Sequence, residues 1–172
     1  MTLSGQHLGI ADIVSHYTDC RSALRSYFSK PAEDPERFAT LSKGEISQDL
    51  ITRLEELELT QSLVVLAAIE AMFRVDFEKR CSGRKRLPLV SEFRQLRRTK
   101  SRRISFDEDI LELWKAHGLL ASTLVGDIRS AMNLRHWLAH GRYWTAKLGR
   151  RYDFDSLVDL MDALARSNVL LS

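Results

Sequence analysis

Apolar residues recur every three or four positions along much of this chain, which is the spacing of an amphipathic helix. Residues 8–28 show that spacing and predict a first helix with one buried side. A turn should follow, because two prolines and a glycine interrupt the pattern at Pro31, Pro35 and Gly44. A charged amphipathic segment then covers about residues 45–57.

The run "SLVVLAAIEAMFRVDF" is apolar on nearly all sides and predicts the central, most buried helix. We expect this helix to cover about residues 60–80, with Thr60 as its N-terminal cap. Glu70 interrupts this apolar run.

Helix start and stop signals divide the second half of the chain. Ser105 and the acids after it indicate a capped helix over "FDEDILELWKAHG", which Gly118 ends. A further helix is expected over residues 119–141, then a loop or short hairpin over 141–153, and a last helix capped by Asp155. The pattern predicts one all-α domain over residues 1–172, an antiparallel bundle of five to six helices.

Composition agrees with a single helical domain. The 172 residues are 44% apolar and 28% charged, and only 8 glycines and 3 prolines interrupt the helices. The chain shows neither a secretory signal nor an apolar run long enough for a membrane span, and Cys20 and Cys81 are expected to be free thiols. We therefore expect a cytoplasmic protein with no membrane contact.

The net charge of +3 is unevenly distributed. Residues 79–103 contain eleven Lys and Arg but one acid, Glu92. Such a block attracts phosphate backbones, and the alternative is a solvated basic loop without a partner.

Residues 119–141 place four polar side chains on one face of a helix. Measured from His140 at about 100° per residue, Arg129 and Asn133 lie within about 20° and His136 within about 40°. Arg135 lies about 140° away, on the apolar side. A buried arginine needs a partner, so either Arg135 pairs with Glu70, or the helix bends and its stem curls toward the histidine.

His136 and His140 also have the i, i+4 spacing of zinc-binding helices. The metalloprotease pattern needs Glu directly after the first His, where this chain has Trp137. No cluster supplies a third ligand, although His117 stays open, and no metal site is predicted. A polar helix face with incidental histidines is the simplest alternative.

Arg135 and His140, four residues apart within "LRHWLAHG", resemble the Arg-x4-6-His signature of the HEPN superfamily (higher eukaryotes and prokaryotes nucleotide-binding domain). The resemblance is sharp over residues 127–144 and only architectural elsewhere. Many members have Asn directly after the Arg, where this chain has His136. The toxin subgroup with His-x-Tyr has Tyr two residues after the His, where this chain has Arg142 before Tyr143.

The resemblance implies a bundle of four or more helices, and a homodimer that brings two Arg and His sets together. Many members are metal-independent endoribonucleases, so the resemblance also implies that activity here, with Arg135 and His140 as the catalytic pair. The chemistry suits these residues, because RNA supplies its own 2′-hydroxyl nucleophile and cleavage needs an acid or base and a cation over the phosphorane. His136 is a candidate second acid or base, and Asn133 can orient a phosphate or ribose.

The segment after this signature interleaves cations with aromatic rings, as single-stranded RNA binding favours. With Arg129, the predicted RNA-binding residues are Arg142, Tyr143, Trp144, Lys147, Arg150 and Arg151, although Tyr143 and Trp144 can equally pack the bundle. No cofactor is expected, and the predicted partners are RNA, a second copy, and an antitoxin or regulatory protein. The rival hypotheses are a non-catalytic HEPN-like module that binds RNA or a protein, and an unrelated helical nucleic-acid-binding domain.

Overall fold

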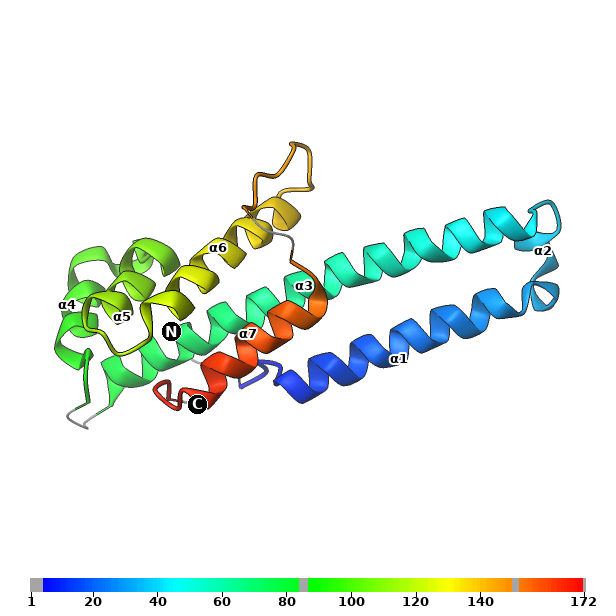
Figure 1. Cartoon of the computed structure of the whole chain (residues 1–172). Coiled ribbons are helices and arrows are strands. Elements are labelled where there is room, and N and C mark those ends of the chain that lie inside the picture. Colours follow the sequence, from blue (N-terminus) through cyan, green and yellow to red (C-terminus); the bar gives the residue numbers. More distant parts are fainter. Residues whose placement is uncertain (1–4, 84–86, 150–151, 172) are drawn as a thin grey trace.

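The computed structural model describes residues 5–83, 87–149 and 152–171, and these residues contain helices but no strand. They form α1 (Ile10–Ser29), α2 (Pro35–Phe38), α3 (Lys43–Ser82), α4 (Val90–Lys100), α5 (Glu112–Ala116), α6 (Ser122–Ala139) and α7 (Phe154–Arg166). A π-helical stretch, Phe106–Leu111, leads directly into α5. The all-α helical bundle predicted from the sequence is confirmed (Figure 1).

The 40-residue helix α3 is the element on which the other long helices pack. Ser42 begins it with a capping box: its hydroxyl accepts from the Glu45 amide at 3.3 Å, and its own amide donates to the Glu45 carboxylate at 2.7 Å. The sequence-based break at Thr60 is wrong. The Thr60 hydroxyl donates to the Glu56 carbonyl at 2.7 Å within the helix, and no glycine or proline interrupts residues 45–82.

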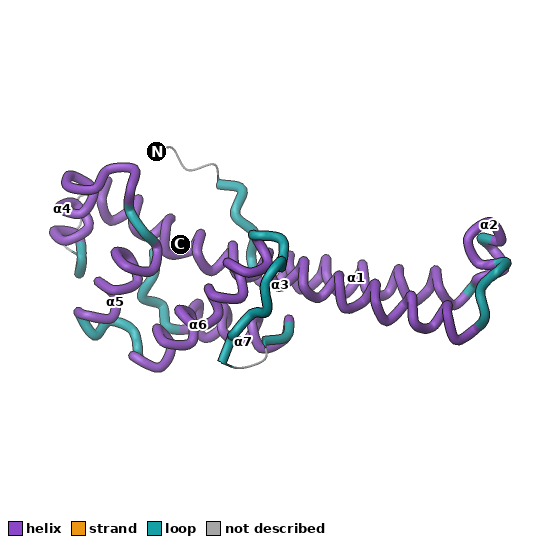
Figure 2. Tube along the Cα trace, turned by 90° about the horizontal axis from the view of Figure 1, so that it is seen from above, coloured by secondary structure: helices purple, strands orange, loops and turns teal. Residues whose placement is uncertain are grey.

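α1 packs antiparallel to α3, and the half of this pair nearest α2, here called the arm, extends beyond the other helices (Figures 1 and 2). Aromatic rings close the tip of the arm, where Phe28 and Phe38 have centroids 5.5 Å apart. The Arg37 guanidinium lies over both rings and pairs with Asp49 at 2.7 Å. The tip is thus stabilised by apolar contact and cation–π interactions.

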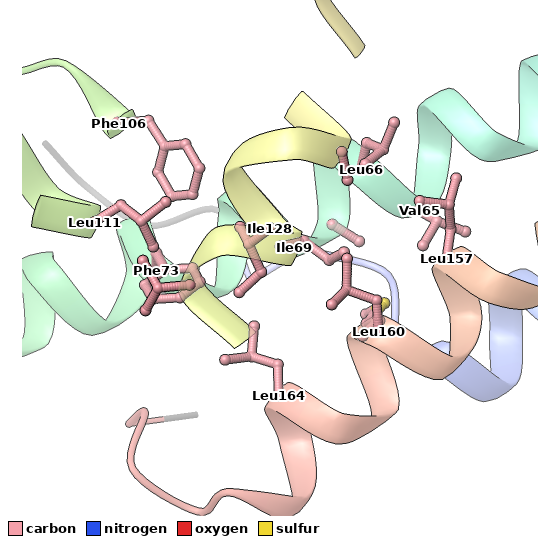
Figure 3. Packing of buried hydrophobic residues seen from close by; sticks show 14 of the residues in the cluster. Val65, Leu66, Ile69, Phe73, Phe106, Leu111, Ile128, Leu157, Leu160 and Leu164 are labelled. Carbon is pink, nitrogen blue, oxygen red and sulfur yellow. The ribbon is translucent and has the colours of Figure 1, made fainter. Parts of the chain in front are cut away.

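The core forms where α3, α6 and α7 meet (Figure 3). Its buried side chains include Leu66, Ile69 and Phe73 from α3, Ile128 from α6, and Leu157, Leu160 and Leu164 from α7. Phe106 and Trp114 pack on Phe73, with ring centroids 5.5 and 6.2 Å away. This packing fixes α6 against α3 and so positions the residues at the end of α6.

Several predicted boundaries differ from the structure. Ser105 does cap the next helix, accepting from the Glu108 amide at 3.2 Å, but the first turns are π-helical. Asp153, not Asp155, caps α7 by accepting from the Ser156 amide at 2.8 Å. Helix α4 lies inside the basic block and was missed, because its many charges hide an apolar stripe in which Phe93 is fully buried.

Candidate functional site

Helix α6 ends in a Schellman motif that reverses the chain at the predicted signature. The Gly141 amide donates to the Leu138 carbonyl at 3.3 Å, and the Arg142 amide to the Trp137 carbonyl at 3.1 Å. Gly141 has φ of +78°, which glycine adopts without strain. His140 is therefore the C-cap residue of α6, and the segment after it folds back beside this helix.

Three rings gather at this end of α6. The exposed imidazoles of His136 and His140 have centroids 4.4 Å apart. The Trp144 ring lies 5.7 Å from His136 and 6.5 Å from His140. The Trp137 indole N–H holds the returning segment by donating to the Trp144 carbonyl at 2.8 Å. The predicted His136 and His140 stripe is thus a ring cluster open to solvent.

Arg135 points to α3, where its Nη2 lies 3.0 Å from Oε2 of Glu70. This confirms the predicted pair, and the alternative in which the stem curls toward the histidine is not adopted. Glu70 also accepts from Nε of Arg74 at 2.6 Å. Nε of Arg135 is buried and has no hydrogen-bond partner among the described residues.

Within one chain, Arg135 and His140 do not come together. Arg135 faces α3, whereas His140 lies at the solvent-exposed end of α6, and no ion pair or hydrogen bond joins them in the described part of the chain. The Asn133 side chain is exposed and makes no hydrogen bond to a described residue.

Arg129, predicted to contact RNA, is held by acids of the preceding helical segment. It donates to Asp107, and its Nη2 lies 2.8 Å from Glu112. The hydrogen bond from Arg129 holds the pKa of the Glu112 carboxyl below its ordinary value. The guanidinium therefore has to leave these carboxylates, at least in part, before it can grip a phosphate.

Arg142 is engaged in the same way. Its guanidinium makes a bidentate contact with the Glu56 carboxylate of α3, at 2.8 and 3.0 Å. Tyr143 is 83% exposed, and Lys147 is exposed as well. Arg150 and Arg151 lie outside the described residues. Of the predicted RNA-binding side chains, Tyr143 and Lys147 are thus the most accessible that the structure describes.

Much of the basic block serves the fold. Arg80 is buried against Asp76, with Nε 2.8 Å from Oδ1, and Arg97 pairs with Glu78 at 2.6 Å. Arg94 donates to backbone carbonyls, and Lys100 pairs with Asp109. Arg84, Lys85 and Arg86 lie outside the described residues. Several cations of the block are therefore engaged within the fold, and fewer of them are free to bind a phosphate backbone than the sequence indicates.

Over residues 5–83, 87–149 and 152–171, no three His, Cys, Asp or Glu side chains come together as metal ligands. Cys20 and Cys81 are free thiols, as predicted. None of the described helices is both long enough and apolar enough to cross a membrane.

No protein-family model, curated protein or solved structure matches the chain. The site must therefore be interpreted from its own geometry.

Two residues that shape this site were missed in the sequence. Trp137 anchors the returning segment, and Glu56 holds Arg142. Glu56 lies two heptads before Glu70, so both acids share one face of α3, about 40° apart at 100° per residue. That shared face was the available signal, and it became informative once α3 was one continuous helix.

Proposed function

We propose that the chain is a metal-independent endoribonuclease that cleaves single-stranded RNA at the end of α6. The observation that carries the proposal is the exposed pair of imidazoles, His136 and His140, beside the Trp144 ring. Imidazole is the side chain that most readily exchanges protons near neutral pH, and an indole stacks on unpaired bases. Proton transfer and base stacking thus fall within one small surface.

The reaction needs no metal. One imidazole takes the proton of the 2′-hydroxyl as its oxygen attacks phosphorus, and the bond from phosphorus to the 5′-oxygen breaks as that oxygen receives a proton. The products are a 2′,3′-cyclic phosphate and a 5′-hydroxyl. His140 is proposed for the first step and His136 for the second, with Arg135 over the phosphorane charge and Asn133 orienting the ribose.

Arg135 and His140 face different ways in one chain, so we further propose that a homodimer completes the site. In that arrangement Arg135 of one chain would act with His140 of the other. The protein would be a cytoplasmic effector of a defence or toxin–antitoxin system, in which an antitoxin or regulatory protein limits its activity.

The test is cleavage of labelled single-stranded RNA in EDTA by the wild type, His140→Ala and Arg135→Lys. Both variants should lose at least about 100-fold in rate, and the products should carry cyclic phosphate ends. His117→Ala is the matched control, because His117 is exposed and precedes α6, whereas His140 lies at the C-terminal end of that 18-residue helix, which is about 27 Å long. Wild-type protein that leaves RNA intact, or an undiminished His140→Ala, would refute the nuclease.

Mixing the two inactive variants tests the shared site. If Arg135 and His140 act across a dimer, each mixed dimer contains one intact site, and up to about a quarter of the wild-type activity should return on random 1:1 mixing. A mixture as inactive as its components, from chains whose mass is that of a dimer, would contradict the shared site and leave cleavage itself untouched.

A non-catalytic HEPN-like module that binds RNA or a protein is the second candidate. The observation that favours it is that the guanidinium groups of Arg129 and Arg142 are both paired with carboxylates, so neither is free to grip the phosphorane of a cleavage reaction. Saturable RNA binding without cleavage in the same assay would support this function instead.

A further inference from the structure

A groove opens on the part of α3 that α1 does not reach. α1 begins at Ile10, and the described residues before it, 5–9, are not helical and line the cavities on this side of the molecule. A cavity of 1220 Å³ lies between these residues, α3 and α4, and its α3 floor includes Ala71 and Val75.

A second, apolar pocket adjoins the first and shares Val75 and His7 with it. It has a volume of 330 Å³, and its walls are Met72 of α3, Met161 and Leu164 of α7, and Leu170 and Leu171 of the C-terminal segment. A pocket of this size and composition receives an apolar side chain, and methionine walls adapt to its shape.

The wide cavity carries positive charge at its rim. Three cations, Arg74, Lys79 and Arg97, line it against one acid, Glu78. Arg74 and Arg97 have acidic partners, at 2.6 Å each, but Lys79 makes no ion pair with a described residue. The rim therefore favours an anionic partner.

The floor of the groove distinguishes a peptide from a nucleic acid. Single-stranded RNA binds on exposed aromatic rings. Among the described residues that line the two cavities, the one Phe, Tyr or Trp side chain is Phe77, and it is only 4% exposed. An apolar floor with a charged rim instead suits an amphipathic helix, which lays its apolar face into a groove.

We propose that this groove is the docking site for an acidic amphipathic helix of a partner protein. Residues 71–79 of α3 span about 12 Å, enough to contact two to three turns of such a helix. Its apolar side chains enter the pocket beside Met72 and Val75, and its carboxylates face Lys79 and Arg74. The inference does not depend on RNA cleavage, because the groove lies on α3 and the ring cluster on α6.

Two synthetic fluorescent peptides of about 14 residues test the proposal. Both carry leucine at i, i+3 and i+4 positions, and the remaining positions are mostly glutamate in one and mostly lysine in the other. By fluorescence anisotropy at low salt, the glutamate peptide should bind full-length protein at least about ten-fold more tightly, and salt should weaken its binding.

Groove variants locate the binding. Lys79→Glu reverses the charge of a half-buried residue that lines the wide cavity and lies outside the hydrophobic core, and it should lower affinity for the glutamate peptide about ten-fold. Val75→Asp should abolish binding, with circular dichroism confirming that the variant is folded. Ile51→Asp is the matched control, because Ile51 is an exposed apolar residue of the same helix on the arm and should have no effect.

Three results would overturn the proposal. The first is equal binding of both peptides, or of the glutamate peptide to wild type and Lys79→Glu. The second is single-stranded RNA that binds in a Val75-dependent manner while neither peptide does. The third is a self-association of the chain that Val75→Asp abolishes, which would make a second copy the occupant.

Discussion

The Glu70 carboxylate lies 3.0 Å from the Arg135 guanidinium and joins the most buried stretch of α3 to α6. Glu70 is 14% exposed and Arg135 is 37% exposed, so the pair is only partly desolvated. Removing Glu70 leaves the Arg135 guanidinium without its partner, whereas removing Arg135 leaves the Glu70 carboxylate with Arg74 alone.

This pair should contribute measurably to stability. We expect Glu70→Gln and Arg135→Gln each to lower the free energy of unfolding by about 1–2 kcal/mol, less than for a fully buried pair because Arg135 is partly solvated. The double variant should lose about 1 kcal/mol less than the sum. Urea denaturation measures all four proteins.

Arg74→Gln is the control for this cycle, since it removes the more exposed partner of Glu70 at 2.6 Å. Its cost should be at most about 0.5 kcal/mol. Strictly additive losses for Glu70 and Arg135 would show that the contact between them carries no coupling energy.

The sequence offered this pair as one of two alternatives, because an acid interrupts the apolar run of α3 and an arginine falls on the apolar side of α6. Periodicity identifies the buried side of α3 and α6, and an acid and a base on those sides leave few other partners. Periodicity also predicted the all-α fold. It failed at Thr60, which was expected to cap the start of a helix. Instead Thr60 lies inside α3, and its hydroxyl donates to the Glu56 carbonyl one turn earlier.

Contacts between distant elements were beyond the sequence pattern. Arg129 and Arg142 look like free cations in the sequence, but their carboxylate partners come from other elements and are known only once the helices pack. Arg80 looks like part of a solvated basic block, and it is buried because α3 continues to Ser82. In each case the three-dimensional partner, rather than local propensity, decides what the side chain does.

The contact between Arg142 and Glu56 should oppose RNA binding. Glu56→Gln removes the charge that holds the guanidinium at 2.8 and 3.0 Å, so Arg142 becomes available to phosphate. We expect affinity for labelled single-stranded RNA to rise about two- to five-fold, with a steeper dependence on salt, in a fluorescence anisotropy titration.

Glu55→Gln makes the same change in net charge at the neighbouring exposed position, where no described residue pairs with the carboxylate. It should raise affinity by less than about two-fold. Equal gains in both variants would show that only the overall charge matters and that Arg142 is not restrained.

Asp76 is expected to be the most sensitive acid in the fold. It is fully buried, binds Nε of Arg80 at 2.8 and 2.9 Å, and accepts from the Leu171 amide at 2.9 Å. Arg80 in turn donates to the carbonyls of Pro88 and Val169, so the pair ties the C-terminal segment to α3.

Asp76→Asn should therefore lower the free energy of unfolding by about 3–5 kcal/mol, because Arg80 is left as a buried charge without a counter-ion. Asp19→Asn, at an exposed position of α1, should change it by less than about 0.5 kcal/mol. Thermal and urea unfolding measure both variants, and a loss at Asp76 no larger than at Asp19 would contradict the role of this pair.

Asp109 should make stability depend on acid pH. Burial of its carboxyl opposes ionisation, yet the Lys100 ammonium and the Ser105 amide, at 2.8 Å, together hold the pKa of Asp109 below its ordinary value. A carboxyl with a depressed folded pKa stabilises the fold above its unfolded pKa, and that stability is lost as pH falls through the folded pKa.

The wild type should accordingly exceed Asp109→Asn by about 1 kcal/mol at neutral pH, and this advantage should shrink as pH drops below about 4. Urea denaturation at a series of pH values from neutral to acid gives the two curves. Lys100→Met should flatten the acid limb in part, since the Ser105 amide still favours the ionised carboxylate. Parallel curves for the wild type and Asp109→Asn would mean that this carboxyl does not link stability to pH.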